Sequence, residues 1–137
     1  MHWTIAYDDA MEVIRVTVQG DLTVEGINAM TAALLGESRR LDVYRFLCDC
    51  RGISLGMGLA QIYRLPIGLR RLGVKSYHMV ALVYSDGPLA TPRFTIFDDR
   101  CQNAGLNHKV FTDYDLACLW LTGINWSIVS GPACVAV

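Results

Sequence analysis

The sequence predicts a single α/β domain, built on a mixed, mostly parallel sheet with an N-terminal antiparallel hairpin and with helices packed on the sheet. Three observations support this. The chain of 137 residues has the length of one domain and can bury one sizeable core. Second, the chain begins with two runs in which apolar and polar residues alternate. Helical and strand-like patterns then follow in turn, in the order β-β-α-β-α-β-α-β-α. Such alternation predicts parallel strands joined by helical crossovers, with the hairpin strand at an antiparallel edge.

The N-terminal hairpin is predicted from two runs with strand periodicity. Apolar and polar residues alternate over residues 3–7 and again over residues 11–19. The acidic pair Asp8-Asp9 between them is typical of a tight turn. Two alternating runs with so short a link predict paired antiparallel strands, each with one face in water.

A first helix and a buried strand follow the hairpin. Thr23 is a suitable N-cap, and Arg39-Arg40 lie where cations stabilise the end of a helix. Between them, apolar residues recur at helical spacing: Val24, Ile27, Met30 and Leu34. Residues 44–49 form an apolar run with little alternation, which predicts a strand covered on both faces.

The second helix is predicted over residues 59–72, where leucines and isoleucines repeat at three- and four-residue steps and Gly73 ends the pattern. Pro66 falls inside it. An interior proline removes a backbone donor and clashes with the preceding turn, so we expect a kink or a break there. Residues 78–84 then predict another buried strand.

The last third of the chain predicts two more helices and one strand. Pro88 and Pro92 can begin a third helix. Its predicted inner face consists of Phe94, Phe97, Cys101 and Ala104. A brief strand is predicted over residues 109–111, and Asp113 caps a short helix. That helix is predicted to bury Leu116, Ala117 and Trp120. The domain is thus predicted over residues 1–122.

Composition excludes several classes of protein. Twelve basic and thirteen acidic residues give a net charge of −1, so no global field attracts nucleic acid. No apolar run is long enough to cross a bilayer, and the first residues do not resemble a signal peptide. We therefore expect a cytoplasmic protein with reduced cysteines. Apolar residues make up 53% of the chain, and residues 123–137 form an apolar C-terminal extension. We expect this extension to pack on its own domain or on a second subunit of a homodimer.

Several segments together resemble the SpoIIAA-like family of STAS-type domains, in particular its uncharacterised bacterial branch. The resemblance rests on VIRVTVQGDLTVEG, DCRG, ALVYSD and KVFTDYDLACLWL. It implies a regulatory or ligand-sensing module rather than a catalyst. Phosphorylatable members of the family carry an Asp-Ser-Ser-Gly segment where this chain reads ISLGMGLAQ, with Ser54 alone. Phosphoswitching of that kind is therefore not expected.

The stretch Cys48-Asp49-Cys50 is the first candidate for chemistry. Residues two apart on a strand face the same side, so both thiols are expected on one face and the carboxylate on the other. A zinc site would need four ligands in spaced pairs, and the other cysteines stand singly. We expect buried structural thiols, with no metal and no cofactor; redox or metal chemistry is the alternative.

The candidate binding residues lie where two strands meet their loops. They are Asp49, Arg51, Ser54, Ser85 and Asp86. In open α/β sheets, ligands bind outside the carboxyl ends of the strands, and a helix N-terminus there can bind an anion. The competing interpretation is structural: Asp49 caps the turn and Arg51 pairs with it on the surface.

Two further surfaces have both a functional and a structural interpretation. Arg64, Arg70, Arg71 and Lys75 form a basic cluster around the second helix. It could contact an acidic partner or an anionic membrane, or be a solvated face. Four aromatic residues could line a pocket for a lipid-like ligand or belong to the ordinary core: Tyr63, Phe94, Phe97 and Trp120.

No catalytic constellation can be argued from linear order. We therefore expect a non-enzymatic regulatory or interaction module. The first alternative is a domain that binds a small apolar or anionic ligand between the second and third helices. The second is a thiol-dependent enzyme using Cys50 or Asp49.

Overall fold

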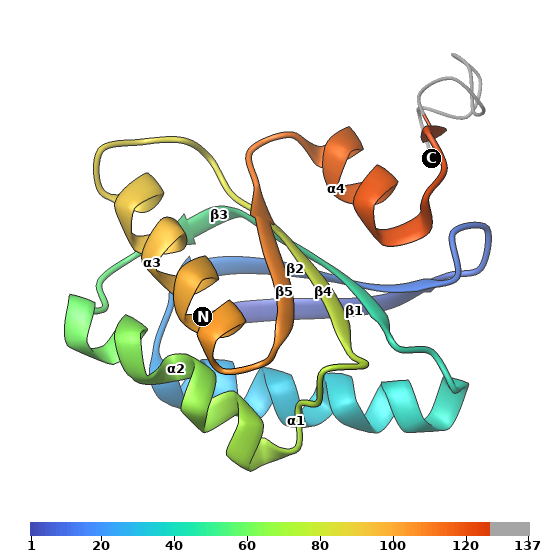
Figure 1. Ribbon diagram of the computed structural model, residues 1–137, viewed down its shortest axis with the longest axis horizontal. Helices are drawn as coiled ribbons and strands as arrows, with labels where there is room; N and C mark the ends of the chain where they lie inside the picture. Colours follow the sequence, from blue (N-terminus) through green and yellow to red (C-terminus); the bar gives the residue numbers. More distant parts are fainter. Residues whose placement is uncertain (127–137) are drawn as a thin grey trace.

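A five-stranded sheet forms the centre of the protein (Figure 1). The structure, a computed structural model, describes residues 1–126. The strands lie side by side in chain order: β1 (His2–Asp8), β2 (Val13–Asp21), β3 (Arg45–Ser54), β4 (Met79–Val83) and β5 (Asn107–Phe111). The β1–β2 pair is antiparallel and the other three pairs are parallel. The predicted fold class, with the hairpin strand at the edge, is confirmed.

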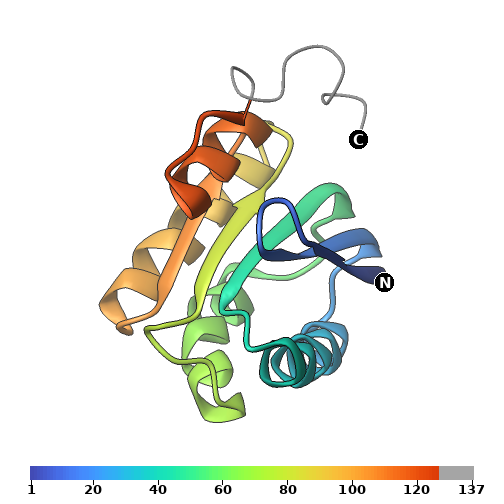
Figure 2. The same ribbon diagram turned by 90° about the vertical axis from the view of Figure 1, so that its right-hand side faces the viewer.

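Within residues 1–126, four helices cover the two faces of this sheet unequally. They are α1 (Val24–Leu41), α2 (Leu59–Leu72), α3 (Ala90–Asn103) and α4 (Tyr114–Thr122). The first three contribute to the apolar clusters on one face, and α4 lies alone on the other (Figure 2). We call these the three-helix face and the α4 face. No helix among residues 1–126 is long and apolar enough to cross a membrane.

The helix ends follow the capping chemistry read from the sequence. The Thr23 hydroxyl accepts a hydrogen bond from the Gly26 N–H at 3.0 Å. The Asp113 carboxylate accepts from the N–H groups of Asp115 and Leu116, at 2.8 and 3.2 Å. Each bond satisfies a donor that the helix leaves free. At the end of α2, Gly73 takes a φ of 111°, which only glycine adopts without strain.

Two expectations about strand and helix boundaries need correction. β3 continues to Ser54, beyond the predicted apolar run, because residues 52–54 pair with residues 19–21 of β2 after a register shift. This exposed extension lacks the apolar pattern on which the prediction relied. Of the kink or break predicted at Pro66, the break is not observed, since α2 runs through this residue from Leu59 to Leu72. Pro66 is buried, and the packing of the inner face of α2 keeps the helix in one piece.

The buried face of α4 also differs from the expectation. Ala117, Cys118 and Leu121 are buried, whereas Leu116 is half exposed and Trp120 only partly buried. The helix is thus rotated so that its smallest side chains face the sheet. Small residues allow the backbone of α4 to approach the strands closely, which closes this face.

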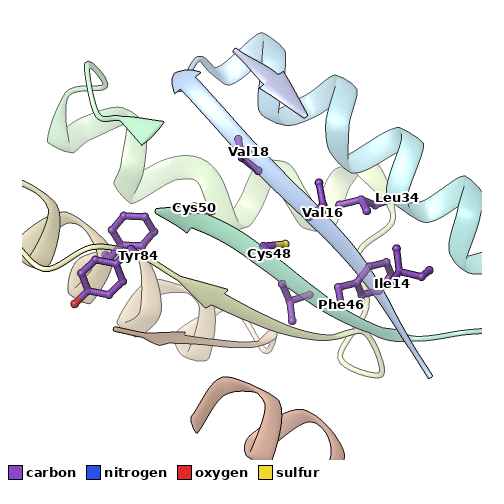
Figure 3. Close-up of a cluster of buried hydrophobic side chains, with 10 residues drawn as sticks. Ile14, Val16, Val18, Leu34, Phe46, Cys48, Cys50 and Tyr84 are labelled. Carbon is purple, nitrogen blue, oxygen red and sulfur yellow. The ribbon is translucent and has the colours of Figure 1, made fainter. Parts of the chain in front are cut away.

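Alternating residues of the strands divide between the two faces. On the three-helix face, Val16, Cys48 and Val80 lie with Leu34 of α1 and Phe94 of α3 (Figure 3 labels the first two and Leu34). On the α4 face, a second set packs against α4: Val13, Leu47, Ala81 and Val83.

The C-terminal extension is described only as far as Trp126. Its indole N–H donates to the Thr122 hydroxyl at 2.8 Å, and the ring packs on the α4 cluster. The start of the extension therefore packs on its own domain. The prediction for the remainder, including Cys134, lies outside the described residues.

Candidate functional site

Two of the predicted binding residues form an ion pair on the α4 face. The Arg51 guanidinium donates to both carboxylate oxygens of Asp49, at 2.9 and 2.8 Å, and the Arg51 N–H donates to the same side chain at 3.1 Å. These bonds hold the pKa of the Asp49 carboxyl below its usual value. The guanidinium also lies 5.2 Å from the centre of the Tyr114 ring of α4. The geometry thus matches the structural interpretation of this pair.

The other three predicted residues are also engaged locally. The Ser85 hydroxyl donates to the Arg51 carbonyl at 3.5 Å, which places it beside the ion pair. Asp86 instead accepts a short hydrogen bond from the Thr91 hydroxyl at the start of α3. Ser54 lies at the end of β3, where its carbonyl accepts from the Leu22 N–H. Asp49, Arg51 and Ser85 therefore come together, and the other two stay apart.

The cysteines of β3 face the three-helix face together, as predicted. Cys48 and Cys50 are both buried in its core. Burial raises the pKa of Cys48 to about 12 and that of Cys50 well above its usual value. The thiolate is the reactive form, so both thiols are held in their unreactive state. Within residues 1–126, no group of three or more metal-binding side chains gathers around a common point.

An apolar cavity of about 120 Å³ lies inside the three-helix face. Its floor is the sheet, with Val18, Phe46, Cys48, Cys50 and Val80. A cavity needs roughly 10–15 Å³ to hold one water molecule. The space under α2 is about ten times that volume, whereas protein interiors contain few voids larger than a water molecule.

The cavity exists because α2 does not rest on the sheet. The backbone of α2 makes its main contacts with α1 and α3, and Figure 1 shows it lying between these two helices. Its inner side chains, Ile62, Leu65 and Leu69, reach down and form the roof. The apolar stripe of α2 thus covers the space without filling it.

Two histidines line the cavity near the amino-terminal ends of β4 and β5. His108 is buried, and its Nδ1 atom has no hydrogen-bond partner among the described residues. Burial lowers its pKa to about 4, so the ring is neutral at pH 7. His78 accepts from the Lys75 N–H through Nδ1 at 2.9 Å, and burial lowers its pKa as well. The lining is therefore uncharged at this end.

The opposite end of the cavity carries the one charged side chain among the described residues that line it. Arg93 lies in the first turn of α3, close to the loop that follows β3. Its Nε donates to the Met57 carbonyl at 3.4 Å and its Nη1 to the Leu89 carbonyl at 3.2 Å. None of the ion pairs within residues 1–126 includes Arg93. A partly buried guanidinium thus faces an apolar space without a carboxylate partner.

The sequence identified this pocket only in part. Phe94 and Phe97 line it, but Trp120 lies on the α4 face, and Tyr63 lies on the exposed side of α2 under the Arg100 guanidinium. Arg93 was missed, although it stands four residues before Phe97 on the same helical stripe. The position of a charged residue, Arg93, at the start of an apolar helical stripe could have indicated that it lines the pocket.

These observations define a class: an α/β sheet domain with an apolar cavity under one helix. No protein-family model matches the sequence, and a search of curated proteins also finds no match.

Proposed function

We propose that this protein is a non-catalytic module that binds a small, largely apolar molecule in the cavity beneath α2. The cavity itself carries the proposal. An engineered apolar cavity of about 150 Å³ in another protein stays dry and binds benzene. The present cavity is of similar size and is lined mainly by apolar side chains, with Thr31, His78, Arg93 and His108 as the polar residues besides the two cysteines. Ligand sites commonly have this composition.

The same residues argue against thiol catalysis at this site. Cys48 and Cys50 face the cavity, but burial keeps them protonated. Asp49, on the opposite face of the strand, is already held by Arg51. Their chemistry fits a lining, not a nucleophile or a general base.

Titration with 1-decanol tests the proposal. The wild-type protein should bind it with a single site in calorimetry, and Cys48→Leu should weaken binding about tenfold because the longer side chain enters the cavity. Cys118→Ala changes a buried cysteine on the α4 face and is the matched control, with unchanged affinity expected. Absence of 1-decanol binding to the wild type, together with a clean apo mass in native mass spectrometry of freshly purified protein, would reject the proposal.

A regulatory or interaction role is the second candidate, and the outer side of α2 favours it. Leu59, Tyr63 and Ile67 are each about half exposed there. The stretch 52–85 also contains four basic residues and no acidic one. A partner with an acidic surface would fit this helix. The STAS-like resemblance implies the same kind of role.

The homodimer expected from the apolar extension has its own test. Light scattering on the full chain and on a chain ending at Trp126 should show a dimer that becomes a monomer on truncation. An unchanged, soluble species in both samples would remove the extension as an interface.

A further inference from the structure

We propose that the ligand is a medium-chain fatty acid whose carboxylate binds Arg93 while its chain lies in the cavity under α2. This inference rests on the proposed function and adds the chemical class of the ligand. It starts from the one charged side chain that lines an otherwise apolar space.

Arg93 is held in place and keeps donors free. Its Nε and one Nη are tied to the backbone carbonyls of Met57 and Leu89, by bonds of 3.4 and 3.2 Å. A guanidinium carries five N–H donors, and these two bonds use only Nε and Nη1. The N–H groups of the second Nη are therefore not used by them. Carboxylates bind such free donors by short, charge-assisted hydrogen bonds. The backbone bonds therefore orient the group for an incoming anion.

The electrostatic surroundings of Arg93 favour an anion. The first turns of α2 and α3 contain no acidic residue, in contrast to Glu25 in α1 and Asp115 in α4. The positive ends of these two helix dipoles are therefore not neutralised by side chains of their own first turns. Asp86, in the loop before α3, is engaged by Thr91. No carboxylate within residues 1–126 forms an ion pair with Arg93. A bound anion would therefore not have to displace one.

The lining of the cavity follows the length of β3. Phe46, Cys48 and Cys50 of β3 all line it, and they span four residue steps, or about 13 Å at roughly 3.3 Å per residue. Arg93 lies at the carboxyl end of this path, and His78 lies at the amino end. The cavity thus has a cationic group at one end and mainly apolar side chains along β3. A linear alkyl chain with one anionic end fits it.

Calorimetric titration with decanoate and 1-decanol, which share a chain length and differ in head group, tests the assignment. At pH 7.5 and low ionic strength, the wild type should bind decanoate about tenfold or more tightly than 1-decanol, because hydrogen bonds to charged groups are the stronger ones. Arg93→Gln should abolish that preference and leave 1-decanol binding unchanged. Arg93→Lys should keep part of it. Arg64→Gln removes the same charge from the exposed side of α2 and is the matched control, with both affinities unchanged.

The outcomes separate the inference from the function on which it rests. Equal affinities for both ligands in the wild type, or an unchanged decanoate preference in Arg93→Gln, would overturn the carboxylate site while 1-decanol binding still supports the apolar cavity. If Arg64→Gln lost as much decanoate affinity as Arg93→Gln, the preference for decanoate would come from general surface charge. That result would also overturn the carboxylate site. If neither ligand binds the wild type, both proposals fail.

Discussion

The two faces of the sheet are covered by different means. On the α4 face, one short helix places Ala117 and Cys118 directly against Leu47, Ala81 and Val83, and all five are at most 2% exposed. On the three-helix face, α2 spans from α1 to α3 and leaves a cavity above the strands. The same strands thus form a closed core on one side and the floor of a binding site on the other. The difference lies in the distance at which the covering helix is held.

The largest expected effect is a difference in unfolding free energy when a leucine on each face is shortened to alanine. Leu47→Ala should cost about 4 kcal/mol of unfolding free energy, because it opens a cavity in a closed core. Leu69→Ala, in the roof of the existing cavity, should cost about 2 kcal/mol, since a side chain that borders a void has fewer contacts to lose. Urea unfolding followed by tryptophan fluorescence measures both. Equal costs would contradict the comparison.

Acid should weaken the three-helix face through His108. Its folded pKa of about 4 lies below the unfolded value of about 6.5, so its contribution is fully present above pH 6.5 and is lost as pH falls towards 4. We expect His108 to account for a loss of about 2.5 kcal/mol between pH 7.5 and 4.5, which His108→Phe should not show.

His78 is the titratable neighbour to consider in that experiment, because its protonation at low pH further disfavours a charge on His108. His2→Phe, at an exposed position, is the control and should keep the wild-type pH profile. Identical pH profiles for the wild type and His108→Phe would show that the ring is not kept neutral by burial.

Enlarging a buried side chain should destabilise the protein on the α4 face but hardly change its stability on the three-helix face. Ala117→Leu inserts three carbon atoms into the closed α4 face and should cost about 2 kcal/mol by overpacking. Cys48→Leu places a larger side chain next to empty space and should change stability by at most about 0.5 kcal/mol. Thermal unfolding of the two variants provides the measurement. A large cost for Cys48→Leu would mean that the space cannot accept a group.

The smallest expected effect concerns the open part of the α4 face. Asp49→Asn removes a partly exposed ion pair with Arg51 and should cost about 0.5 kcal/mol at low salt, falling with added salt. Because the pKa of Asp49 is lowered, the contribution is present above the unfolded carboxyl pKa and is lost as pH falls through the lowered value. A cost of several kcal/mol, measured by urea unfolding, would assign this pair a larger role than the surface geometry supports.

Much of this architecture could be predicted because it is local. The hairpin follows from period-two alternation, and the start of α1 follows from Thr23. The proximity of Asp49, Arg51 and Ser85 could also be expected, since parallel strands present their carboxyl ends at one edge.

The cavity could not be predicted, because the stripe of Ile62, Leu65 and Leu69 has the same spacing whether it touches the sheet or stands above it. The height of α2 depends on α1 and α3, which are distant in sequence. The unpaired state of Arg93 likewise depends on which carboxylates the fold keeps away from it.

The most direct test of the account is a methyl-resolved NMR titration with 1-decanol. If the three-helix face holds the binding site, methyl signals of Val80 and Leu69 should shift in a saturable way, while those of Val83 and Leu121 on the α4 face should stay in place. Shifts confined to the α4 face, shifts spread evenly over both faces, or no saturable shifts at all would contradict it.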